Sequence, residues 1–76
     1  MKNYVITYSE IDLNNLFTGY LQIQGKTGID ALQKHYGKKF KRYGGRDCDV
    51  LLLQGVYSKE DNTIKTRGNM CGYKIV

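Results

Sequence analysis

The sequence has few of the residues that build catalytic and metal sites. His35 is its single histidine, and the two cysteines, Cys48 and Cys71, form no Cys-x-x-Cys pair. No cluster of carboxylates stands at the spacing of a metal site, and no predicted helix follows Gly44-Gly45-Arg46 to make it a phosphate loop. We therefore expect a protein that is not an enzyme, has no catalytic residues and uses no metal or cofactor.

Long apolar runs are also missing. No stretch approaches the roughly 20 residues that span a bilayer, and residues 2–8 alternate instead of forming the apolar block of a signal peptide. We expect a single domain (residues 1–76) in the cytoplasm, that of the host cell if a phage encodes the chain. In that reducing compartment Cys48 and Cys71 should be free thiols, with a disulfide as the alternative.

Alternating apolar residues predict strands, and one segment has the pattern of a helix. The helix should begin after Thr27 as its N-cap, present Leu32 to the sheet and stop at Gly37. The fold class is then α+β: an antiparallel sheet of four to five strands with one short helix packed across it, in the order ββαβββ. The strands are predicted at residues 2–8, 17–24, 38–43, 49–57 and 63–76.

Glycines and polar residues predict the turns between the later strands. Gly44-Gly45 indicates a tight turn, and Ser58–Asn62 predicts a hairpin in which paired positions add up to about 120. A bulge is expected near Gly68-Asn69 or at Gly72. That register would place Val50 opposite Met70 and bring the two cysteines to within about one position of each other.

The positive charge is confined to one segment. The chain carries 12 basic and 7 acidic residues, yet residues 1–33 are net −1 and residues 47–76 are neutral. Residues 34–46, the basic band, contain six cations and no carboxylate: Lys34, Lys38, Lys39, Lys41, Arg42 and Arg46.

Cations interleaved with aromatic residues suit contact with phosphates and bases. Tyrosines favour binding surfaces, and Tyr8, Tyr20 and Tyr43 are expected to be exposed. An edge strand whose lysines prevent unwanted pairing, with Phe40 in the core, explains the same pattern without a binding role. The candidate binding residues are Lys34, Tyr36, Lys38, Lys39, Lys41, Arg42, Tyr43, Arg46 and Tyr20.

At residues 22–31 a predicted strand ends before the capping residue Thr27, and Ala31 lies near the start of the short predicted helix. This junction and the order of elements resemble a type I-F anti-CRISPR family of ββαβββ layout, although the basic band is more basic than that pattern requires. The resemblance implies a small phage or mobile-element inhibitor that docks on a protein or nucleoprotein effector, such as a CRISPR–Cas complex. Direct binding of nucleic acid is the alternative, and a homo-oligomeric accessory protein is the second. No membrane partner is expected, and the chain should be a monomer or small homo-oligomer.

Overall fold

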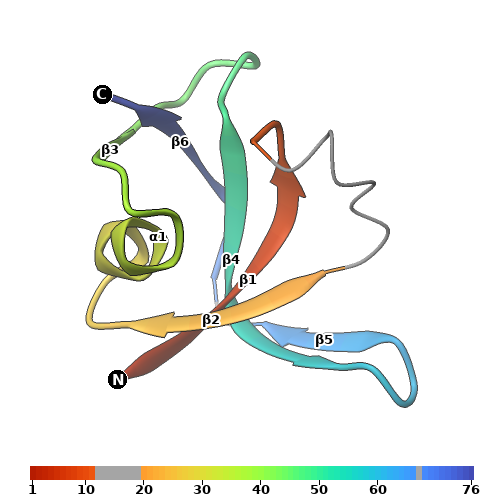
Figure 1. The fold of residues 1–76 in the computed structure, drawn as a ribbon. Coiled ribbons are helices and arrows are strands. Elements are labelled where there is room, and N and C mark those ends of the chain that lie inside the picture. The colour runs from red at the N-terminus through yellow and green to blue at the C-terminus, as the bar shows by residue number, and fades with distance from the viewer. Residues whose placement is uncertain (12–19, 67) are drawn as a thin grey trace.

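A curled antiparallel sheet, with one helix packed against its inner face, makes up the fold (Figure 1). The computed structural model describes residues 1–11, 20–66 and 68–76. The predicted α+β class is confirmed, while the predicted last strand is divided into two, which gives six strands within the described residues. The elements are β1 (Lys2–Ser9), β2 (Leu21–Gly25), α1 (Gly28–Tyr36), β3 (Phe40–Arg42), β4 (Val50–Ser58), β5 (Thr63–Thr66) and β6 (Cys71–Ile75). The predicted start of the second strand, at residue 17, lies outside the described residues.

The helix α1 is fixed at both ends by its own sequence. The Thr27 hydroxyl accepts the Asp30 N–H at 3.1 Å, and the Asp30 carboxylate accepts the Lys26 N–H at 2.9 Å. Two N–H groups at the start of the helix are thereby satisfied. At the other end Gly37 adopts φ 69 and donates to the Gln33 carbonyl at 2.8 Å, the left-handed cap that glycine takes without strain. Both predicted helix ends are confirmed.

One hydrophobic core joins α1 to the inner face of the sheet. Leu32 is fully buried, as expected for the main contact of the helix. Gly25 lets β2 and α1 approach closely, because a Cβ there would lie 2.5 Å from the Ala31 nitrogen. The buried core residues are Tyr4, Ile6, Ile23, Ala31, Leu32, Phe40, Val50, Leu52 and Tyr73.

The sheet order is β2-β1-β4-β6-β3, and β5 pairs with β4. β4 is therefore central: β1 pairs along one side, while β6 and then β5 pair along the other. The turn at Gly44-Gly45 does not place β3 beside β4, because β6 lies between them. The connection instead crosses the side of β6, where Tyr43 N–H donates to the Gly72 carbonyl and Asp49 N–H to the Tyr73 carbonyl.

The predicted register of the last hairpin is wrong by one position at its start and by three at its end. Tyr57 lies opposite Ile64, and Val50 lies opposite Tyr73. The expected irregularity near Gly68 is present: Gly68 has φ 86, and the pairing shifts by two positions between β5 and β6. Cys71 lies opposite Leu52, while the Cys48 side chain packs against Gly72, one position along β6, where a Cβ would lie 3.3 Å from its Sγ. Both cysteines are free in the structure.

Candidate binding surface

The basic band begins in the last turn of α1, continues through β3 and ends in the connection to β4. Lys34 is compensated, because its Nζ lies 3.3 Å from the Asp30 carboxylate, four residues earlier on the helix. The remaining cations are exposed, and none forms an ion pair with a carboxylate among residues 1–11, 20–66 and 68–76. These uncompensated cations are Lys38, Lys39, Lys41, Arg42 and Arg46.

β3 divides the band between two faces of the sheet. Phe40 is buried in the core, so Lys41 points to the outer face, where it lies opposite Lys74 on β6. Arg42 returns to the inner face and lies opposite Tyr73. β3 is the edge strand of the sheet, and its three residues make a short edge rich in positive charge. The edge-strand explanation is thus correct about the architecture, although it leaves the other exposed cations unexplained.

Tyr43 belongs to a small polar cluster. Its hydroxyl donates to the Asp47 carboxylate at 2.7 Å, and Lys74 Nζ lies 3.4 Å from the same carboxylate and 4.9 Å from the centre of the Tyr43 ring. The hydrogen bond from Tyr43 is the main reason why the pKa of Asp47 is lowered, and the same bond raises the pKa of Tyr43. The expected exposure of Tyr43 is therefore wrong, since it is half-buried. A carboxylate that follows the band in sequence holds the ring in place.

Tyr36 and Tyr20, the other two aromatic residues predicted to bind a partner, both contact other side chains of the chain. Tyr36 is half-buried, and its hydroxyl lies 2.8 Å from the hydroxyl of Ser9. Tyr20 and Tyr8 are exposed as expected, but Tyr20 packs edge to face on Tyr57, with ring centres 5.3 Å apart. Tyr20 directly precedes β2, at the opposite end of the strand order from β3. The structure therefore does not bring Tyr20 into the surface formed by the band.

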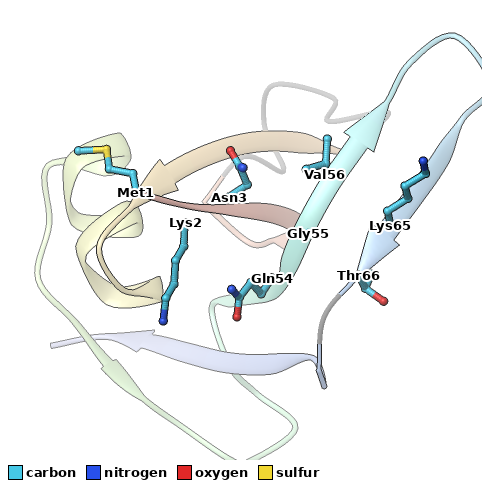
Figure 2. Close-up of a pocket in the computed structure, with 8 residues that line it drawn as sticks. All are labelled: Met1, Lys2, Asn3, Gln54, Gly55, Val56, Lys65 and Thr66. Carbon is cyan, nitrogen blue, oxygen red and sulfur yellow. The ribbon is translucent and has the colours of Figure 1, made fainter.

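The inner face of the sheet carries two adjoining hollows that the sequence did not predict. The larger, about 480 Å³, lies between the start of β1 and β5; Figure 2 shows Lys2 and Gln54 pointing to the same side and Lys65 on β5 across the groove. The smaller, about 250 Å³, lies at the N-terminal end of α1, and Gln54 lines both. Because Lys2 and Lys65 are far apart in sequence, no short segment could reveal that they line the same hollow. The only available signal was the alternation of β1, which puts Lys2 on the inner face.

Gln22 connects three strands where β1 and β4 separate. Its side-chain amide nitrogen donates to the carbonyls of Tyr4 and Gly55, both at 3.0 Å, and its amide oxygen accepts the Tyr57 N–H at 2.7 Å. The paired residues of β1 and β4 end at Tyr4 and Gln54. The Gln22 side chain therefore takes the place of a further pair of backbone hydrogen bonds beside the larger hollow.

The described part of the chain offers little that would support other classes of site. Within it, no three residues among histidine, cysteine, aspartate and glutamate lie together as possible metal ligands. None of its helices has the length and apolar character to cross a bilayer. Comparison with protein-family models, with curated proteins and with solved structures finds no match to this chain.

Proposed function

We propose that this chain is a non-catalytic binding protein that docks, through the basic band, on a partner carrying nucleic acid. Its partner would be a nucleoprotein effector, and binding would block the effector's own contact with guide or target strands. A CRISPR–Cas complex is the effector that the resemblance at residues 22–31 suggests. The band would lie against the phosphate backbone.

The observation that supports the proposal is the set of exposed, uncompensated cations on a fixed edge of the sheet. Lys38 and Lys39 follow the capped end of α1. Lys41 lies on β3, directly after Phe40, which is buried in the core. Such a set neutralises phosphates without reading a base sequence. Tyr36 is engaged in the structure, which favours contact with the backbone over stacking on bases.

The test compares two triple variants of equal charge. In the first, Lys38, Lys39 and Lys41 are changed to Ser. In the second, the matched control, the exposed lysines Lys26, Lys59 and Lys65 outside the band are changed to Ser. Each variant is checked for folding by circular dichroism. Each is then assayed for binding to a short duplex over a range of salt concentrations and for rescue of phage plating on a CRISPR-active host.

The band variant should lose the rescue and bind duplex more weakly, while the control keeps the rescue. For each phosphate contact removed, the slope of log K against log salt should flatten by about 0.9. Weak duplex binding by the unmodified chain, together with rescue that depends on the band, would identify a nucleoprotein and not free nucleic acid as the target. If the band variant folds and matches the control in every assay, the band has no binding role and the proposal fails.

A further inference from the structure

Several of the residues that line the smaller hollow on the inner face can donate hydrogen bonds, and none of the described residues that line it is acidic. It lies where the start of α1 meets the sheet, between Tyr4 of β1, Tyr73 of β6 and Arg42 of β3. Gly28, the first residue of α1, forms part of its wall. A Cβ at Gly28 would lie 2.6 Å from the Tyr73 hydroxyl, so this hydroxyl is held directly against the first turn of the helix.

Two tyrosine hydroxyls open into this hollow without a protein partner. Tyr4 is 8% exposed and Tyr73 is 7% exposed, and neither hydroxyl forms a hydrogen bond with any residue in the described ranges 1–11, 20–66 and 68–76. No fully buried side-chain oxygen in those ranges lacks a partner, so both hydroxyls reach the solvent. A hydroxyl that reaches solvent and has no protein partner is free to donate a hydrogen bond to water or to a ligand. Burial raises the pKa of both tyrosines, so both stay protonated and able to donate at neutral pH.

Positive charge and the start of α1 lie beside the Tyr73 hydroxyl. The Arg42 guanidinium is close enough to Tyr73 to act on its pKa, and it donates to Cys71 Sγ at 3.3 Å. The N–H groups of Gly28 and Ile29, in the first turn of α1, have no acceptor within the helix. A helix N-terminus attracts anions, and the nearby Asp30 carboxylate is already compensated by Lys34.

We propose that this hollow binds a phosphate group. Arg42 would supply the charge, and the hydroxyls of Tyr4 and Tyr73, with the first N–H groups of α1, would supply the hydrogen bonds. Donors from four elements, β1, α1, β3 and β6, surround the space, which suits a tetrahedral anion with several acceptor oxygens. The site goes beyond the proposed docking function, because it lies on the inner face and does not need Lys38, Lys39 or Lys41. The phosphate belongs either to a small phosphomonoester or to the backbone of a nucleic acid.

The test is a titration of the full ¹⁵N-labelled chain, followed by NMR. Three probes are added in separate titrations: inorganic phosphate, a mononucleotide with one terminal phosphate, and a dinucleotide whose single phosphate is internal. The amide signals of Gly28 and Ile29 should shift with inorganic phosphate. If only the phosphomonoesters compete with it, the natural ligand is a small molecule; if the internal phosphate competes, it is a nucleic-acid backbone.

Arg42→Gln and Tyr73→Phe remove the charge and one hydroxyl with little change in shape. Each should weaken phosphate binding about tenfold or more, as expected for hydrogen bonds to a charged group. Arg46→Gln and Tyr20→Phe make the same chemical changes outside the hollow and should leave the affinity unchanged.

Two results would contradict the proposed phosphate site. One is an unmodified chain whose Gly28 and Ile29 signals do not respond to phosphate. The other is equal weakening in the pocket variants and their controls, which would mean general attraction to a positive protein. The band variant, with Lys38, Lys39 and Lys41 changed to Ser, should still bind inorganic phosphate in the hollow. Failure of the docking proposal is thereby distinguished from failure of this one.

Discussion

Replacement of Gln22 by Leu should destabilise the sheet at the point where β1 and β4 separate. Leucine keeps nearly the same volume but cannot make the three hydrogen bonds of the amide group to Tyr4, Gly55 and Tyr57. The pairing of β1 with β4 ends at Tyr4 and Gln54, so the ladder between these two strands does not supply bonds in their place. Two of the three lost bonds are to backbone groups of β4, the strand that pairs with β1, β5 and β6.

The size of the effect follows from the number of bonds and from their access to water. Three neutral hydrogen bonds contribute about 0.5–1.5 kcal/mol each to the free energy of unfolding. Gln22 is half-buried, so water can replace part of what is lost. We expect Gln22→Leu to cost about 2–3 kcal/mol. In a domain of this size that lowers the melting temperature by about 10–20 °C.

Urea unfolding measures the loss, with Gln24→Leu as the matched control. Gln24 is on the same strand, is exposed and makes one hydrogen bond to the Asn3 side chain at 2.8 Å, so its replacement should cost less than about 0.5 kcal/mol. Amide exchange gives a local reading, because the Tyr57 N–H should exchange faster only in Gln22→Leu. Equal losses in the two variants, with Tyr57 exchange unchanged, would refute the bridging role of Gln22.

Four further predictions concern the core, the helix start and the thiols. Leu32→Ala should cost about 2–5 kcal/mol in urea unfolding, and an unchanged midpoint would mean that the helix does not depend on this contact. Gly28→Ala should lower the melting temperature although alanine favours helices, because the added Cβ has no room beside Tyr73; a rise would contradict the close approach. The pKa of Asp30 is lowered chiefly by the Lys26 N–H, so its contribution to stability is present above the usual aspartate pKa and is lost as the pH falls through the lowered value. Asp30→Asn should therefore destabilise at neutral pH and lose that effect in acid, and a pH-independent difference would exclude the mechanism. Mass spectrometry after alkylation in cells should find Cys48 and Cys71 both labelled, and an intact disulfide would overturn the prediction.

Local signals in the sequence predicted the parts of the fold that depend on near neighbours. The ends of α1 follow from Thr27 and Gly37, whose capping roles involve residues within four positions. β4 pairs on both sides, as its apolar run Val50–Leu53, which puts apolar residues on both faces of the strand, indicates. These features are set by backbone chemistry that a short window of sequence contains.

Features that depend on distant residues were missed. The hairpin register failed because an irregularity between Thr66 and Cys71 adds two positions, and sequence shows where such an irregularity can occur but not its size. The position of β6 between β3 and β4 has no local signal. For the same reason Tyr20 and the basic band were predicted to share one binding surface. In the structure Tyr20 lies just before β2, whereas the band contains β3, and these two strands are at opposite ends of the sheet. The smaller hollow is lined by residues of β1, α1, β3 and β6, among others, so it could not be predicted from any single segment.

The place of β6 in the sheet gives this chain an unusual order of assembly. Within the described residues β3 pairs with β6 alone, and β6 comes after β3, β4 and β5 along the chain. The edge that carries Lys41 therefore cannot form its strand pairing until residues 71–75 have been added, and before that only the contacts of Phe40 with the core and α1 can hold it. A chain cut before Cys71 would keep every cation of the band yet lose the strand that fixes β3 in place. Proteolysis within residues 66–70 would thus remove the strand pairing of a charged edge that lies almost thirty residues earlier in the sequence.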